Sequence, residues 1–296
     1  MPKKKRKKAR SAVTINPAGF ELGQLKIYAY IVPLALFMLL PIVYIFNNAF
    51  KPLSELFAFP PRFFVSRPTL DNFASLAKTT RQMVTGLSRY IFNSALVTLA
   101  VVVFTIIISS MAGYAFSKLK FKGKNALFEV NTLALMFVPV AVMIPRYLVI
   151  DRLGISDTYF AHILPLLAMP VGMFLLKQFI DQVPDELIEA AKVDGAGPFR
   201  IYAKVVIPLV LPALATVAIL AFQGVWGNIE TSSLFTTKDS MRTLTFFMNT
   251  LVSANASVAG QGMAAAGMLV MFVPNIILFI ILQSKVMNTM AYSGMK

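Results

Sequence analysis

The stretch Asp181–Pro208 reads DQVPDELIEAAKVDGAGPFRIYAKVVIP and carries more structural information than any other part of this 296-residue chain. Pro184 suits the first position of a helix, where its missing N–H is not needed. Acidic residues follow it and favour the positive end of the helix dipole. Gly195 can end the helix in a left-handed conformation, and Pro198 can begin another. The stretch therefore predicts a short helix, a Gly-Ala-Gly corner and a second helix.

The composition around this corner is typical of a membrane protein. Hydrophobic residues make up 57% of the chain and charged residues only 14%. A soluble domain carries about 25% charged residues, so this chain could not cover a surface that faces water. We therefore expect an all-α integral membrane protein.

Six windows with few or no charges are long enough to span a bilayer, which needs about 20 helical residues. Glu129 and Arg146 fall close to the ends of the third window, where a charge costs less than at a helix centre. We expect six transmembrane helices within one domain over residues 27–284. The windows are Ile27–Phe46, Phe92–Phe116, Leu127–Ile150, Thr158–Leu176, Val205–Val225 and Met263–Leu282.

Basic residues predict the orientation. Lysines and arginines gather before the first window, after the second and after the fourth, and the positive-inside rule keeps such loops cytoplasmic. Both termini are then cytoplasmic. The run Pro2–Lys7 resembles a nuclear localisation signal, but six spans favour its binding to anionic membrane lipid. The expected segments are a basic cytoplasmic N-terminus (1–26), a cytoplasmic loop (181–204), an external loop (227–262) and a cytoplasmic tail (285–296).

Several kinds of chemistry are not expected of this chain. It has no cysteine and a single histidine, so thiolate sites, disulfides and two-histidine metal motifs are excluded. We predict no metal site and no catalytic residue, and we expect His162 to be structural. The chain also has no Gly-x-x-x-x-Gly-Lys-Ser/Thr loop. It is therefore not expected to bind ATP or another cofactor.

Three parts of the 181–208 stretch together resemble the EAA loop of binding-protein-dependent ABC importer permeases. They are Glu189-Ala190-Ala191, Asp194-Gly195-Ala196 and Val205-x-Ile207-Pro208. The family pattern is Glu-Ala-Ala, three residues, Gly, nine residues and Ile-x-Leu-Pro, with conservative replacements here at 205 and 207. The resemblance implies a type I ABC importer permease fold and a coupling helix that docks into a cytoplasmic ATPase. The residues expected at that contact are Asp185, Glu186, Glu189, Ala190, Ala191, Asp194, Gly195, Ala196 and Pro208.

Other segments narrow the resemblance to carbohydrate permeases of the maltose-transporter type, in particular the smaller permease subunit. They are Ala112–Gly123, Ile144–Tyr147, Leu153–Tyr159, Phe174–Phe179 and the tail Val286–Lys296. The tail has Ser293-Gly294 where the family usually has two glycines, so its contact with an ATPase stays open. The resemblance places the chain in a prokaryotic plasma (inner) membrane. It implies as partners a homologous second permease subunit, two ATPase subunits that use ATP and Mg, an extracellular solute-binding protein and a sugar or oligosaccharide, but no nucleic acid.

Polar residues near the end of the fifth window are candidate contacts of the substrate pathway: Gln223, Trp226, Asn228 and Glu230. An aromatic ring and an amide could hold a sugar by stacking and by bonding its hydroxyls, although an interfacial aromatic belt would use the same residues. Asn131, Asn275 and Gln223 lie inside spans and should avoid lipid. We expect these three to bond helix to helix rather than to contact substrate.

Three alternatives remain open at this point. The chain could be an ABC importer permease for a solute other than a sugar. An ion-coupled secondary transporter would need a carboxylate near the middle of a span, and an intramembrane enzyme would need a nucleophile with its base or a metal cluster. Copurification of an ATPase would separate an ABC importer permease from the secondary transporter and the enzyme.

Overall fold

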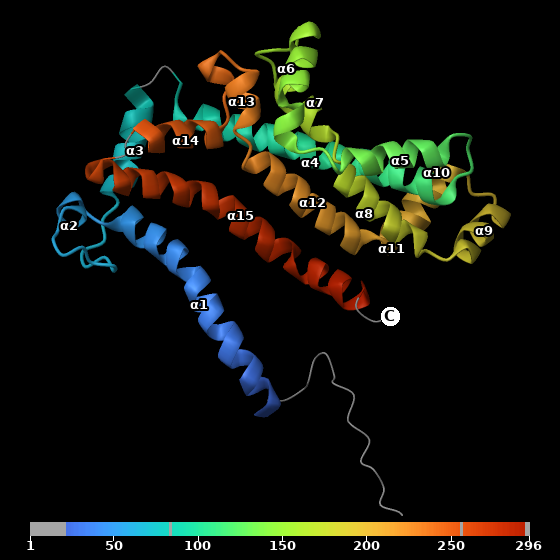
Figure 1. The fold of residues 1–296 in the computed structure, drawn as a ribbon, viewed down its shortest axis with the longest axis horizontal. Helices are drawn as coiled ribbons and strands as arrows, with labels where there is room; N and C mark the ends of the chain where they lie inside the picture. Colours follow the sequence, from blue (N-terminus) through green and yellow to red (C-terminus); the bar gives the residue numbers. More distant parts are fainter. Residues whose placement is uncertain (1–21, 83–84, 255–256, 294–296) are drawn as a thin grey trace, which may run out of the picture.

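The structure is a computed structural model and describes residues 22–82, 85–254 and 257–293. Within these ranges every regular element is a helix (Figure 1). Most of the predicted basic N-terminal segment, including the Pro2–Lys7 run, lies outside the described residues. So do the last three residues of the predicted tail, 294–296.

Four long apolar helices can each cross a membrane unbroken or nearly so, and they correspond to the first, second, fifth and sixth expected spans. The fifth begins several residues later than the predicted window. Prolines 33 and 41 lie inside the first helix and Pro274 inside the last. The four are α1 (Leu22–Phe50), α4 (Leu87–Lys118), α12 (Leu211–Trp226) with its continuation α13 (Glu230–Leu234), and α15 (Val258–Ser293).

The third and the fourth expected spans each consist of two helices that meet at a bend. The third consists of α5 (Lys124–Ala134), a 3₁₀ turn η1 (Pro139–Val142) and α6 (Met143–Arg152), with a bend of 108°. The fourth consists of α7 (Tyr159–Leu167) and α8 (Pro170–Asp181), with a bend of 44°. Pro139 and Pro170 stand at the breaks and cannot donate the hydrogen bond that would continue a helix. The described residues therefore contain six spans only if each bent pair counts as one.

Shorter helices lie at the two ends of the long ones. At one end are α2 (Leu53–Leu56), α3 (Asp71–Gln82), η3 (Asp239–Met241) and α14 (Leu244–Ala254), and α6, α7 and α13 stand above the bundle in the view of Figure 1. We call this the α13 end. At the other, the α9 end, are α9 (Asp185–Val193), α10 (Pro198–Ile201), the π-helix η2 (Tyr202–Val206) and α11 (Ile207–Leu209).

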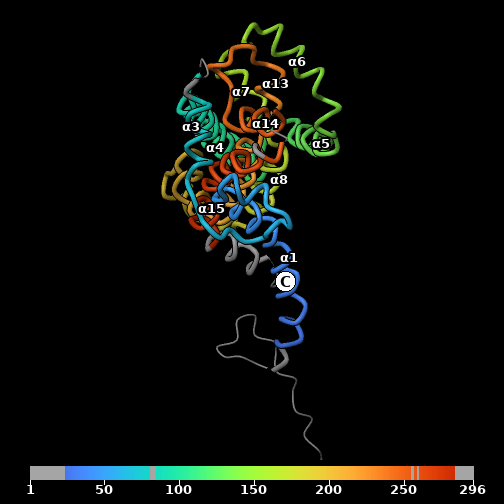
Figure 2. The backbone as a smooth tube through the Cα atoms, turned by 90° about the vertical axis from the view of Figure 1, so that its left-hand side faces the viewer, coloured from blue at the N-terminus to red at the C-terminus, as the bar shows by residue number. Residues whose placement is uncertain are grey.

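The helices pack around α4. The contact between α4 and α8 is the most extensive contact between two helices of the described residues. Gly113 is needed there, because a Cβ atom would lie 3.1 Å from the backbone N of Lys177. One apolar cluster joins α4, α8, α9 and α12 at the α9 end, and another joins α4, α12, α14 and α15 toward the α13 end. Figure 2 shows the same bundle from its left-hand side, with α1 extending away from it.

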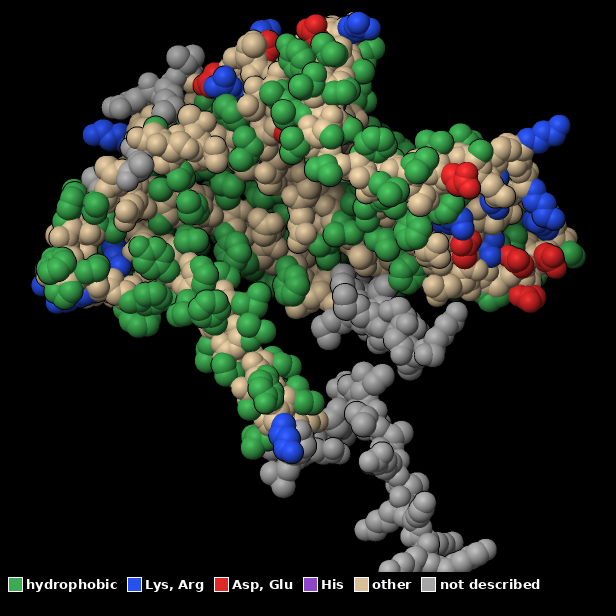
Figure 3. Space-filling view, viewed as in Figure 1, with side chains coloured by type: hydrophobic (Ala, Val, Ile, Leu, Met, Phe, Trp, Pro, Cys, Tyr) green, Lys and Arg blue, Asp and Glu red, His purple; other side chains and the backbone are tan. Residues whose placement is uncertain are grey.

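Charged side chains gather at the two ends in the view of Figure 3, and the band between them is almost free of charge. This is the distribution that a bilayer requires. Ala49 at the end of α1 packs on Ala265 and Ala266 near the start of α15, so the start of α1 and the end of α15 extend away from the same contact (Figure 1). The two described chain ends therefore lie on one side of the bundle.

Candidate functional site

The α9 end contains the predicted helix, corner and helix. Pro184 precedes α9, and Gly195 follows it with a φ of +78°. The corner is closed by backbone bonds, from Gly195 N to Lys192 O at 3.0 Å and from Ala196 N to Ala191 O at 2.9 Å. Pro198 begins α10. The predicted helix, corner and helix are therefore confirmed, except that Pro184 caps α9 from outside instead of occupying its first position. Gly195 accepts the left-handed region that ends the helix.

The outer face of α9 is open to a partner. Glu186, Glu189 and Ala190 are exposed, and Val193 is 88% exposed. On the opposite side Ile188 is 4% exposed and belongs to the apolar cluster of α4, α8 and α12. The helix is thus held by one side and presents acidic, small and apolar side chains on the other. Such a surface can receive another protein.

Asp185 points differently from the other acidic residues of α9. Its Oδ1 is 2.7 Å from the Nζ of Lys118, the last residue of α4. The hydrogen bond and the positive charge of Lys118 lower the pKa of the Asp185 carboxyl. This residue was predicted to contact a partner, but the structure places its carboxylate against the same chain.

Pro208 lies apart from the exposed face of α9. It is part of α11 and borders a groove that Leu187 and Leu209 also line. The π-helix η2 precedes it, and the backbone at Val210 leaves the helical region before α12 begins. Pro208 therefore marks a break between the corner and the long helix.

Three of the four predicted pathway residues have partners within the chain. Trp226 is 8% exposed, and its Nε1 donates to Met271 O at 2.9 Å. Asn228 Oδ1 accepts from the N–H and the hydroxyl of Thr231, both at 2.9 Å. Glu230 forms an ion pair of 2.8 Å with Arg146 of α6. These contacts join α12 and α13 to their neighbours and engage at least one polar atom of each of the three side chains within the chain.

Gln223 is the exception. Its side chain is exposed on α12, and it borders a pocket with Asn275 and Met271 of α15. Asn275 Nδ2 donates to Met271 O of its own helix at 3.1 Å. The expected helix-to-helix bond is thus wrong for Asn275, although Asn131 does bond across, from α5 to Pro170 O at 3.3 Å. A Cβ atom at the neighbouring Gly224 would meet nothing within 4 Å.

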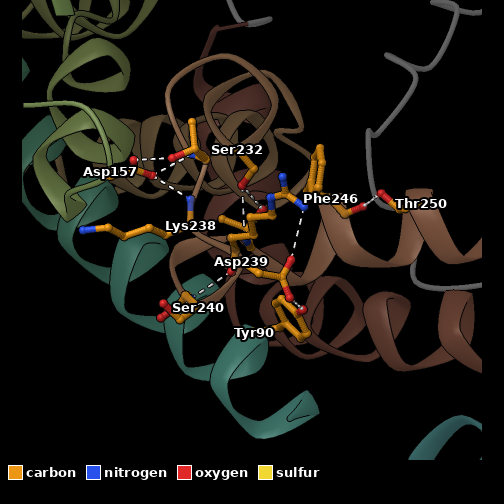
Figure 4. Close-up of polar contacts among 12 residues, drawn as sticks. Tyr90, Asp157, Ser232, Lys238, Asp239, Ser240, Phe246 and Thr250 are labelled. Atoms are coloured by element: carbon orange, nitrogen blue, oxygen red, sulfur yellow. Dashed lines mark hydrogen bonds and ion pairs between the residues drawn. The ribbon is translucent and has the colours of Figure 1, made fainter. Parts of the chain in front are cut away.

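A polar network ties the loop after α13 to α4 and α7 (Figure 4). Asp157, with a φ of +58°, accepts from the backbone N–H groups of Thr237 and Lys238 at 2.6 and 2.8 Å. These bonds lower the pKa of its carboxyl. Nearby, the Tyr90 hydroxyl donates to Asp239 Oδ2 at 2.6 Å. Asp157 lies in the Leu153–Tyr159 segment of the family resemblance, but its bonds to the loop after α13 were not predicted.

His162 has the structural position that we expected. Its ring is fully buried between Thr231 Oγ1 at 2.9 Å and the carbonyl of Met241 at 3.1 Å. It joins α7 to the loop after α13. The ion pairs of Lys118 with Asp185 and of Arg146 with Glu230 were not predicted, because an ion pair between distant residues leaves no trace in one sequence.

Known proteins resemble this chain over most of its length. A family model described as the inner membrane component of binding-protein-dependent transport systems matches residues 105–284. A putative ABC transporter permease, ORF2 of Caldicellulosiruptor sp. (strain Rt8B.4), is 34% identical over 207 residues, 69% of this chain and 73% of the relative. The arabinooligosaccharides transport system permease AraQ of Halalkalibacterium halodurans is 30% identical over 275 residues, 91% of this chain and 94% of the relative.

The trehalose transport system permease SugB of Mycobacterium tuberculosis is 28% identical over 262 residues, 88% of this chain and 93% of the relative. A chain in the crystal structure of a bacterial ABC transporter, involved in the import of the acidic polysaccharide alginate, has the same fold. Its TM-score is 0.76 at 20% identity, over 90% of this chain and 99% of that chain.

Proposed function

This chain belongs to the family of inner membrane components of binding-protein-dependent transport systems, and we propose that it forms half of the membrane pathway of an ATP-driven sugar importer. It is a multi-pass protein of a prokaryotic plasma (inner) membrane. A homologous permease subunit forms the other half of the pathway. Two cytoplasmic ATPase subunits bind the α9 ends, and an extracellular solute-binding protein delivers a sugar or oligosaccharide.

The exposed corner of α9 is the observation that carries this proposal. Its face of Glu186, Glu189, Ala190 and Val193 stands at one end of the spanning bundle and is backed by the buried Ile188. We therefore call α9 the coupling helix. ATP binding closes the ATPase pair and draws two coupling helices together, so that the pathway opens outward, and hydrolysis resets it. ATP and Mg²⁺ are bound by the ATPase subunits and not by this chain, which lacks a phosphate loop.

The substrate side of the proposal depends on the face that Gln223 and Asn275 share. An amide exposed on a spanning helix avoids lipid and faces a polar pathway instead. Amides both donate to and accept from hydroxyl groups, as a sugar requires. Of the residues that the structure describes, those that line the pocket beside them are all uncharged, which favours a neutral glycosyl unit. The names of the arabinooligosaccharide and trehalose permeases point to the same class of substrate.

The test is reconstitution of the complete complex in proteoliposomes. ATP hydrolysis should rise when the binding protein carries its sugar, and labelled sugar should enter with it. The chain purified alone should hydrolyse no ATP. Hydrolysis by a clean, partner-free sample, or uptake driven by an ion gradient without ATPase subunits, would contradict the proposal. If amino acids or peptides stimulated ATP hydrolysis and sugars did not, the chain would still belong to an importer, but its substrate would not be a sugar.

A further inference from the structure

Lys118 holds the start of the coupling helix to the end of α4. Its Nζ donates to Asp185 Oδ1 and to Val183 O, both at 2.7 Å. The lysine side chain is only 8% exposed, whereas that of Asp185 is 77% exposed. Both charges suit their helices, because Lys118 stands in the last turn of α4 and Asp185 in the first turn of α9. The pair therefore joins the negative end of one helix dipole to the positive end of another.

The helices behind this contact are tightly joined. Besides the close approach at Gly113, Ser117 donates to Asp181 Oδ1 at 2.6 Å and so ties the end of α4 to the end of α8. The same carboxylate accepts from Lys177 Nζ at 2.7 Å. A displacement that reaches Lys118 is thus shared by α4 and α8, since packed helices deform little.

The route from the corner to α12 is interrupted. It passes through the π-helix η2, Pro208 and the non-helical backbone at Val210. Such irregularities are where helices bend. Tyr202, within η2, instead contacts α4, with its hydroxyl 2.7 Å from that of Ser110. Hydrogen bonds therefore attach both flanks of the coupling helix to α4, whereas its contact with α12 is apolar packing.

We propose that Lys118 transmits the displacement of the coupling helix to α4 and α8, as a positioning residue that acts through Asp185 and Val183. The inference rests on the proposed function, because it assigns a route to the movement that the ATPases cause. The outer face of α9 binds the ATPase, and the inner anchor at Lys118 converts that binding into movement of the pathway. Binding of the ATPase and transmission of its movement to α4 therefore depend on different residues.

The experiment measures sugar transported per ATP hydrolysed by the complete complex in proteoliposomes. Lys118→Met keeps the apolar stem and removes the charge, and Asp185→Asn removes the partner charge at an exposed position. Each should lower the ratio about fivefold or more, within the range typical of coupling between sites, while ATPase subunits still copurify. Lys118→Arg should restore most of it. Lys120→Met is the matched control, an exposed lysine two residues away for which the structure shows no side-chain partner.

Two results would overturn the inference. One is an unchanged ratio in both Lys118→Met and Asp185→Asn. The other is loss of ATPase copurification in Lys118→Met with a normal ratio in Asp185→Asn, which would make Lys118 a residue of assembly. If the wild-type complex transports no sugar at all, the proposed function fails instead, so the two failures are distinguishable.

Discussion

Substitution of Glu189 tests whether the coupling helix binds the ATPase. It is exposed on the coupling helix, and no ion pair involving it is found among the described residues. A charge-assisted hydrogen bond to the ATPase would contribute about 1.5–3 kcal/mol, whereas an exposed pair contributes about 0–1 kcal/mol. Glu189→Ala should therefore weaken ATPase association roughly ten-fold or more, and transport should fall with it.

The measurement is recovery of ATPase subunits with the tagged chain, at matched membrane expression, together with sugar-stimulated hydrolysis. Asp151→Ala is the control, because it removes an exposed carboxylate at the α13 end. Wild-type recovery and hydrolysis in Glu189→Ala would show that this carboxylate is merely solvated.

Gly195 tests backbone geometry at the corner. Its φ of +78° costs an L-residue roughly 1–2 kcal/mol, so Gly195→Val should distort the corner and cut transport sharply while membrane insertion is preserved. Gly197→Val is the matched comparison, since Gly197 has a φ of −70° and open space around it. Uptake assays on both variants at equal expression distinguish the effect of backbone strain at position 195 from the effect of a larger side chain in the corner. An equal loss of uptake in the two variants would show that the left-handed backbone at Gly195 is not the cause.

At the scale of one helix, α12 should form a wall of the pathway on its Gln223 face. Gly224→Leu fills space that is open in the structure, so folding and assembly should be unaffected while uptake of sugar falls about ten-fold or more, through obstruction worth more than about 1.4 kcal/mol. Gly86→Leu is the control, because its Cβ meets only Ser88 Oγ at 3.8 Å. Normal uptake in an assembled Gly224→Leu complex would place the pathway elsewhere. Failure of assembly would show that this face packs on the second permease subunit.

The loop after α13 should loosen in acid because of Asp157. Its pKa is lower in the folded protein than in the unfolded chain, so the stabilisation is present above the unfolded value of about 3.9. It is lost as the pH falls through the folded value. Hydrogen-exchange protection of the Thr237 and Lys238 amides should accordingly be constant from neutral pH to about 5 and should drop only below about 4.

Asp157→Asn supplies the comparison for that measurement, because asparagine also tolerates the positive φ. The variant should show weaker protection at neutral pH and no further acid-dependent drop that is specific to this loop. Strong protection that persists in the variant at all pH values would show that the loop is held by Tyr90 and His162 without Asp157.

For the whole molecule the prediction concerns orientation. The chain has no cysteine, so single cysteines can report the side of the membrane without background. Cysteines at Lys120 and Lys192 should react with an impermeant reagent only from the cytoplasm, and cysteines at Arg62 and Lys238 only from outside. The positive-inside rule gives this expectation, and the packing of the end of α1 on the start of α15 agrees with two chain ends on one side. If cysteines at positions 120 and 238 reacted from the same side of the membrane, the predicted orientation would be wrong.

The sequence alone determined the membrane class, the approximate spans and the helix–corner–helix of α9. These depend on composition, on apolar length and on residues such as Pro184 and Gly195, whose effects act within a few positions of the chain. The breaks in the third and fourth spans also have a local cause, since Pro139 and Pro170 stand at them. A proline alone does not predict a break, however, because α1 and α15 contain prolines and remain continuous helices. Only packing decides whether a proline bends or breaks the helix that contains it.

The roles of the polar side chains were decided by the tertiary structure. Asp185 and Glu189 look alike in the sequence, yet one bonds Lys118 and the other is exposed. Trp226 and Glu230 suited a sugar, but Met271 and Arg146, distant in the chain, occupy their polar atoms. Residue type limits what a group can bond, whereas the partner depends on which helix the fold brings within about 3 Å. That choice is made by the whole bundle, so no single stretch of the chain records it.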